Sequence, residues 1–186
     1  MAGAQPLSLT ARMSARWKRF ADDRRGAAAV EFALIAAPFF FLIFGLLEVC
    51  MIFIMSTVME HAVSEAARPL RTGEAQEAAM TQVQFRQSVC NEMFEMLDCD
   101  ARLYIDVRTV SDFASSPIGS ALDGSGDVDD TDFMYDPGGP NDIVAVRVFY
   151  EWDLITPYIS QPLRNMGGNR HLLQANAVFR NEPFGS

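Results

Sequence analysis

The chain has 186 residues, of which 49% are apolar, and it carries a formal net charge of −9 at pH 7. An acidic chain whose only lysine is Lys18 lacks the basic patch that nucleic-acid binding requires, so nucleic acid is not an expected partner. Much of the apolar content is concentrated in residues 30–58, so the rest of the chain can form only one small soluble domain.

The apolar run predicts a single membrane-spanning helix, with the lipid bilayer as its surroundings. Residues 30–58 carry only two charges, Glu31 and Glu48. About 20 apolar residues span a bilayer, whereas the apolar region of a cleaved secretory signal has about 7–15. The run is therefore long enough for a span with one or two protruding turns, and too long for an ordinary cleaved signal peptide.

The charges on either side of this run predict its orientation. Residues 1–25 carry a net charge of +4, so the remainder of the chain carries −13. Because short basic flanks stay in the cytoplasm, we expect the N-terminus there and residues beyond about 60 in the periplasm or outside a bacterial cell.

Helical patterns continue after the span. The first helix is expected to end or bend at Arg68-Pro69, because the residue before a proline avoids helical geometry. Apolar residues at every fourth position predict a second helix over residues 74–97. These apolar residues are Phe85, Val89, Met93 and Leu97.

Alternating apolar and polar residues predict three strands, at 103–107, at 143–152 and within 171–180. Stretches rich in Ser, Asp, Gly and Pro at 111–141 and 156–168 are expected to be loops. The predicted fold class is α+β. A long N-terminal transmembrane α-helix is followed by a small exterior domain, in which a helix packs on an antiparallel sheet of about three strands.

Two of the three cysteines are candidates for a disulfide. Cys50 lies inside the apolar run, whereas Cys90 and Cys99 lie in the part predicted to be exported, where disulfides form. In a continuous helix the Cα atoms of Cys90 and Cys99 would lie about 13.5 Å apart, whereas a disulfide tolerates less than about 7 Å. The favoured interpretation is a Cys90–Cys99 disulfide, with the helix kinked or stopped between the two residues.

Nothing in the sequence specifies catalysis, a cofactor or a metal. His61 and His171 are the only histidines and share no ligand spacing, and no phosphate-binding loop, nucleophile elbow or Cys-x-x-Cys is present. The acidic loop Asp123–Asp132 has part of a calcium-binding pattern, but Val128 and Met134 stand where an EF-hand requires glycine and glutamate. A solvated loop is the better interpretation, and a weak cation site is the alternative.

The boundary between the basic leader and the apolar run predicts a processing and assembly site. Gly26 is preceded by arginine and followed by three alanines and a valine before Glu31. A carboxylate inside a bilayer costs roughly 2.5–3.5 kcal/mol on insertion scales, so an unpaired Glu31 calls for a partner. The expected partner is the amino group of Ala27, freed by cleavage after Gly26 and presented by a neighbouring subunit. The simpler alternative is an uncleaved signal anchor with Glu31 at headgroup depth.

A family resemblance rests on three stretches of this region. They are Arg25-Gly26-Ala27-Ala28-Ala29-Val30-Glu31-Phe32-Ala33-Leu34, then Pro38, then Phe44-Gly45-Leu46-Leu47-Glu48. In these stretches the chain resembles the TadE-like family, minor pseudopilins of the tight-adherence (Flp, type IVb) pilus. The similarity is looser in the exterior domain, where it includes Cys90 and Cys99 and the stretch 178–184. Glu31-Phe32 stands where major pilins of this system have Glu-Tyr, which favours a minor subunit.

The resemblance implies cleavage by a prepilin peptidase between Gly26 and Ala27, and a Glu31 that helps to recruit or register subunits. The implied partners are that peptidase, other pilin and pseudopilin subunits, and the inner-membrane pilus assembly machinery. The implied function is that of a minor pseudopilin in the inner membrane that takes part in pilus assembly. The alternative is an uncleaved bitopic anchor that carries a periplasmic binding or scaffold domain.

On this interpretation the chain divides into three parts. Residues 1–26 are a cleaved cytoplasmic leader, residues 27–68 a transmembrane and assembly helix, and residues 69–186 a periplasmic or extracellular α+β domain.

Glu48, the second acid in the run, has two interpretations. It lies about 25 Å along the helix from Glu31, close to one hydrocarbon thickness, which places it near the far membrane interface. Alternatively it contacts a neighbouring helix, where Gly45 would allow close approach of the two backbones.

Overall fold

The structure is a computed structural model that describes residues 26–93, 98–115, 121–156 and 159–185. The chain divides into two compact units, residues 1–44 and 45–186. The predicted leader, residues 1–25, lies outside the described residues.

Helix α2 (Ala27–Ala66) contains the apolar run. Among the described residues, one helical stretch, Ala27–Thr72, is long and apolar enough to cross a membrane. Pro38 lies inside α2 without ending it. The predicted long N-terminal apolar helix is thereby confirmed.

The helix ends where Arg68-Pro69 predicted a break. α2 stops at Ala66, and α3 (Arg68–Thr72) follows with Pro69 in its first turn, where a missing N–H needs no partner. Gly73 then ends α3 in the left-handed region with φ of 89°, a conformation that glycine adopts without strain.

The second helix is shorter than predicted, because residues 74–97 do not form one continuous helix. α4 (Glu74–Glu77) is a single turn, and α5 (Gln82–Glu92) begins only after a turn in which Ala79 has φ of 49°. The apolar residues that predicted the helix begin only at Phe85, after that turn, so their spacing gave no information about residues 74–81. Residues 94–97 lie outside the described residues.

A capping box explains where α5 begins. The N–H of Gln84 donates to the Thr81 hydroxyl oxygen at 3.4 Å, and the N–H of Thr81 donates to Oε1 of Gln84 at 2.8 Å. These two bonds satisfy donors that the first turn of a helix leaves free. A threonine followed three residues later by glutamine was visible in the sequence and could have predicted this start.

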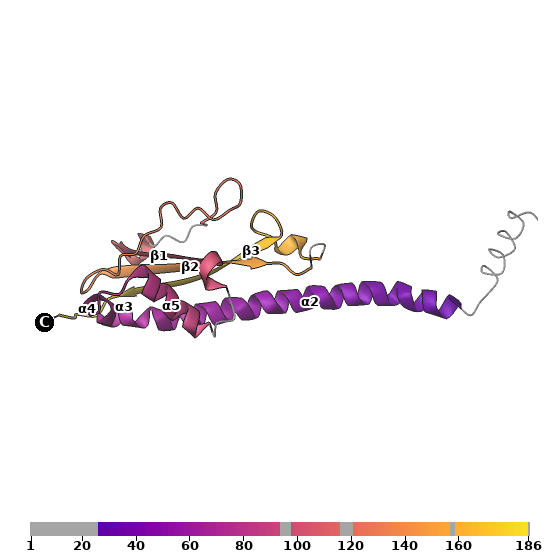
Figure 1. The fold of residues 1–186 in the computed structure, drawn as a ribbon, viewed down its shortest axis with the longest axis horizontal. Coiled ribbons are helices and arrows are strands. Elements are labelled where there is room, and N and C mark those ends of the chain that lie inside the picture. Colours follow the sequence, from indigo (N-terminus) through magenta and orange to yellow (C-terminus); the bar gives the residue numbers. More distant parts are fainter. Residues whose placement is uncertain (1–25, 94–97, 116–120, 157–158, 186) are drawn as a thin grey trace, which may run out of the picture. The chain divides into compact units, whose positions relative to one another are not determined.

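The described residues contain one sheet of three antiparallel strands in the order β1-β2-β3 (Figure 1). The strands are β1 (Leu103–Val110), β2 (Ile143–Asp153) and β3 (Arg170–Arg180). All three predicted strands are therefore confirmed, and the fold is α+β.

One face of the sheet packs on the helices within the second unit (Figure 1). Ile105, Val148 and Ala175 lie opposite one another in neighbouring strands and are each at most 1% exposed. Buried residues of α2 at helical spacing face them: Met55, Met59, Ala62, Val63 and Ala66.

The loop between β1 and β2 packs over part of the opposite face. Ala121 from this loop is buried with Phe149 of β2 and Leu172 of β3. Phe133, also in the loop, stacks on Phe149 with ring centroids 5.5 Å apart. The segment predicted as an exposed loop is irregular, as expected, but it also shields apolar residues of the sheet.

The predicted disulfide between Cys90 and Cys99 is present, with the two Cα atoms 6.1 Å apart. α5 ends at Glu92, so the helix does stop between the two cysteines. The bond ties the end of α5 to α6 (Cys99–Arg102), which leads directly into β1.

We expect reduction of this disulfide to lower the free energy of unfolding by about 2–3 kcal/mol, because the open chain regains the entropy of a short loop. Urea unfolding of the full chain in detergent, with and without dithiothreitol, measures the difference. The control is Cys50→Ser, which removes the free cysteine on α2 and should leave the dithiothreitol effect unchanged. Equal midpoints in both conditions would contradict a stabilising role.

Candidate functional site

The predicted processing site coincides with the start of α2. Gly26 immediately precedes Ala27, the first residue of the helix. Glu31 lies four residues further along, one helical turn above Ala27 and on the same side. Its side chain is exposed and has no hydrogen bond or ion pair to any residue that the structure describes. A carboxylate in this position is available to a partner outside the chain.

The helix around Glu31 presents apolar side chains to its surroundings. Phe32 is 71% exposed, and most large apolar residues from there to Leu47 are also exposed. Phe39 and Phe40 contact each other edge to face, with ring centroids 5.6 Å apart. Such a surface can be covered by lipid or by apolar helices of other subunits.

Glu48 has the opposite environment, because it is only 3% exposed. Its carboxylate accepts the backbone N–H of Ile155 at 2.5 Å and that of Thr156 at 3.1 Å. The hydroxyls of Thr156 and Ser160 also donate to it. The acid is thus satisfied by the loop that follows β2, within the second unit.

A turn in that loop creates the binding site for the carboxylate. The N–H of Ser160 donates to the carbonyl of Thr156 at 2.9 Å, and the two hydroxyl oxygens lie 2.6 Å apart. Ser160 is fully buried. Glu48 therefore supplies the acceptor for donors that the buried turn would otherwise leave unpaired.

Gly45 lies beside the same loop, one helical turn before Glu48. A Cβ built on Gly45 would come within 2.7 Å of Cγ2 of Ile159. The lack of a side chain at Gly45 thus allows Ile159 to approach the helix. In the structure the chain's own loop takes this place, and the contact of Gly45 and Glu48 with a neighbouring helix stays a prediction.

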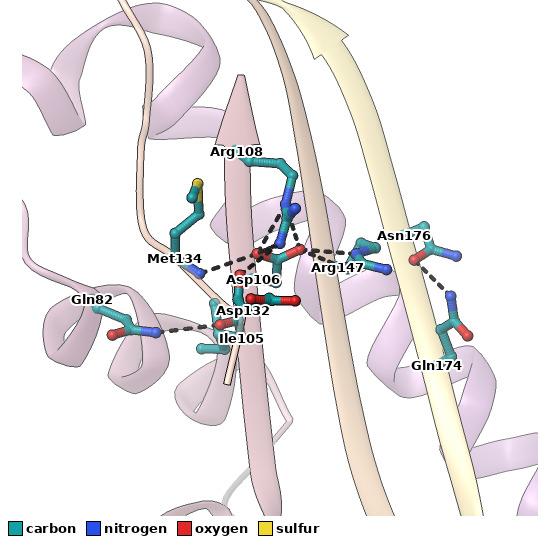
Figure 2. A network of polar contacts seen from close by, with 9 residues as sticks. All are labelled: Gln82, Ile105, Asp106, Arg108, Asp132, Met134, Arg147, Gln174 and Asn176. Carbon is teal, nitrogen blue, oxygen red and sulfur yellow. Dashed lines mark hydrogen bonds and ion pairs between the residues drawn. The ribbon is translucent and has the colours of Figure 1, made fainter. Parts of the chain in front are cut away.

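A second buried carboxylate, Asp106 on β1, binds two arginines on the face of the sheet opposite the helices (Figure 2). Arg108 donates to it at 2.6 Å and Arg147 at 2.7 Å, and the N–H of Met134 donates at 3.2 Å. Burial alone would raise the pKa of the Asp106 carboxyl, but the hydrogen bonds from Arg108 and Arg147 lower it below its ordinary value.

The Asp106 network holds the long loop on the sheet. Arg108 also donates to the carbonyl of Asp132 at 3.0 Å, and the Arg147 guanidinium lies 5.5 Å from the ring centroid of Phe149. Sequence analysis missed this network. Asp106 and Arg108 are two residues apart on β1 and share one face, so their ion pair could have been predicted from the sequence. Arg147 becomes their neighbour only through the β1–β2 register.

We expect Asp106→Asn to lower the free energy of unfolding at pH 7 by about 3–5 kcal/mol, because two arginines lose the charge that pairs with them. Because the pKa of Asp106 is lowered in the folded state, the free energy of unfolding depends on pH. Asp106 stabilises the fold above the ordinary aspartate pKa of about 3.9, and this contribution is lost as the pH falls through the lower folded value.

Urea unfolding at pH 7 and pH 3 tests both parts of this prediction. The variant should lose less stability on acidification than the parent chain. Asp130→Asn, at an exposed aspartate of the same loop, is the control and should unfold like the parent chain. A variant as stable as the parent chain at pH 7 would show that the network contributes nothing.

Residues of the acidic loop Asp123–Asp132 form hydrogen bonds with one another. The Asp123 carboxylate accepts the N–H groups of Ser125 and Asp127, each at 2.9 Å. In the part of the chain that the structure describes, no group of three His, Cys, Asp or Glu side chains could hold a metal ion.

The fold and the site together define a class of protein: the described residues contain one long apolar helix, consistent with a single-pass membrane anchor, and a small α+β domain. Residues 26–68 match the family model described as TadE-like protein. The match begins at Gly26 and ends at Arg68, so it confirms the family resemblance over the segment that carries it. Comparisons with curated proteins and with solved structures found no match.

Proposed function

We propose that this protein is a minor pseudopilin, which a prepilin peptidase cleaves after Gly26 and which then takes part in assembly of a tight-adherence pilus. The TadE-like match over residues 26–68 carries the proposal, because this family suggests involvement in that pilus. Glu31, which is exposed and bonds to no residue that the structure describes, lies one turn from Ala27 and supports it independently.

The proposed mechanism is electrostatic selection of register. Cleavage creates an ammonium group on Ala27, and in a low-dielectric surrounding both this cation and the Glu31 carboxylate are costly unless they pair. Two subunits at the correct axial offset pair the amine of one with the Glu31 of the other. Any other offset leaves both charges unpaired. The exposed apolar residues between Phe32 and Leu47 supply the packing area.

The position of Glu48 supports a placement of the helix in the membrane. From Ala27 to Leu47 the helix rises about 30 Å, which matches a hydrocarbon core of about 30 Å. Glu48 follows directly and is enclosed by the loop after β2. We therefore place the cytoplasmic boundary near Ala27 and the periplasmic boundary near Glu48, with the α+β domain in the periplasm.

The rival function is that of an uncleaved bitopic anchor with a binding or scaffold domain. An anchor of this kind needs neither Gly26 nor an acid one turn after a new N-terminus. Deletion of the gene separates the two functions. We expect the deletion strain to lose surface pili and surface attachment, and the parent gene to restore both. Normal piliation in the deletion strain would favour the anchor.

A further inference from the structure

The two edge strands of the sheet, β1 and β3, differ in how their outward backbone groups are hydrogen-bonded. On the β1 edge, the N–H of Val107 donates to the carbonyl of Met134, and its carbonyl accepts the N–H of Asp136, both at 2.8 Å. The Gln82 side chain donates to the carbonyl of Ile105 at 3.2 Å (Figure 2). Side-chain and loop groups therefore occupy the outward hydrogen-bonding groups in the middle of this edge.

Among the described residues, the β3 edge is covered near its start and again just beyond its end, where the N–H of Glu182 donates to the carbonyl of Arg71 at 2.8 Å. The side chain of Asn165 accepts the N–H of Leu172 at 2.6 Å and donates to its carbonyl at 3.2 Å. Leu172 thus turns its backbone groups away from β2. In an antiparallel ladder alternate residues do the same, so Gln174, Asn176 and Val178 also turn their N–H and C=O groups outward.

These three residues have unpaired outward backbone groups within the part of the chain that the structure describes. Only the side chains of Gln174 and Asn176 bond, to each other at 3.1 Å (Figure 2). Natural proteins protect long edge strands with lysine, proline, bulges or covering segments. Residues 174–178 of β3 contain neither lysine nor proline, whereas the β1 edge is covered.

Positive charge gathers at the far end of the open edge. A groove of about 200 Å³ runs between the end of α2, α3 and β3. Arg68 and Arg71 are among its lining residues, with Val178 on the strand side. Arg180, the last residue of β3, is exposed. Arg71 forms an ion pair with Glu182 at 3.7 Å, so Arg68 and Arg180 supply the positive charge at this end, in a chain whose net charge is −9.

We propose that the β3 edge from Gln174 to Arg180 is a docking site for an extended segment of another protein subunit. The segment adds a fourth strand through the outward N–H and C=O groups of Gln174, Asn176 and Val178. It carries carboxylate side chains at the end that lies beside Arg68 and Arg180. The backbone bonds supply affinity for any extended chain, and the arginines select an acidic one.

This site goes beyond the proposed function, because pairing at the edge requires neither cleavage after Gly26 nor the charge of Glu31. The test therefore uses the full chain in intact membranes, from cells with and without the prepilin peptidase. A photo-reactive benzoylphenylalanine replaces Gln174 in one chain and Asn176 in another. A control chain carries it at Ser125, in the exposed loop.

We expect both edge positions to cross-link to one acidic segment of another subunit, in both strains. Moving the probe from Gln174 to Asn176 should shift the attachment point on that segment by two residues, as strand pairing requires. Val178→Pro removes one outward N–H and should lower the cross-link yield from Gln174 roughly three- to tenfold. Val178→Thr keeps the N–H and should retain the yield.

A second variant covers the case in which the proline disturbs the strand. Arg68→Glu with Arg180→Glu leaves the backbone edge intact and should also lower the yield, by roughly tenfold. Four results would overturn the proposal: cross-links only to lipid, cross-links to a second copy of this chain, a pattern shared with Ser125, or a yield that the glutamates leave unchanged.

Discussion

In the Glu31→Gln variant we expect pili to be lost while the chain still folds, inserts into the membrane and is cleaved. Glutamine keeps the size of the side chain but removes the charge, so the Ala27 ammonium of a neighbouring subunit has no counter-ion. Removing one partner of a desolvated ion pair costs about 3–5 kcal/mol, which corresponds to a loss of roughly a hundredfold or more in incorporation. Subunits recovered from sheared pili, relative to those in the membrane, measure the effect.

The matched control is Glu65→Gln, at an exposed acid near the other end of α2. It makes the same chemical change and should leave piliation unchanged. The unfolding midpoint of the Glu31 variant should equal that of the parent chain, since Glu31 bonds to no described residue. Normal pili in the Glu31→Gln strain would sink the proposed role of this charge.

In the Glu48→Ala variant we expect the opposite outcome, a large loss of stability in the second unit. The carboxylate accepts two backbone N–H groups and two hydroxyls of the loop after β2, and Ser160 is fully buried. Each buried donor left without a partner costs about 1–3 kcal/mol, so we expect a total of roughly 3–5 kcal/mol. That is a large share of the 5–15 kcal/mol by which typical domains are stable.

Hydrogen exchange locates this effect. The amides of Ile155 and Thr156 should exchange much faster in the variant, whereas those in the middle of β2 should change less. Glu60→Ala, which removes an exposed acid of the same helix, should change the free energy of unfolding by less than about 0.5 kcal/mol. If Glu48→Ala and Glu60→Ala unfold at the same urea concentration, the buried contact does not stabilise the fold.

Patterns of neighbouring residues in the sequence predicted the helices and strands whose formation depends on those residues. The apolar run predicted α2, and the period of two predicted three strands. The predicted export of Cys90 and Cys99 indicated the disulfide, and their spacing then required the helix to end between them. The turn at Ala79 was missed, because the apolar residues that predicted the helix all follow it, starting at Phe85. The capping box at Thr81 was the better signal.

Long-range partners were out of reach of these patterns. Glu48 lies 108 residues before Thr156, and no periodicity connects an acid on an apolar helix with two hydroxyls in a loop. Arg147 reaches Asp106 only because the β1–β2 register places them opposite each other. The unequal edges of the sheet likewise depend on Gln82 and Asn165, whose positions are set by tertiary packing.

The most direct test of the proposed function is the intact mass and N-terminal sequence of the membrane-extracted protein, from cells with and without the prepilin peptidase. The proposal predicts a mature chain that begins at Ala27 only when the peptidase is present. A chain that keeps residues 1–26 in both strains would contradict it and leave an uncleaved anchor with an α+β domain.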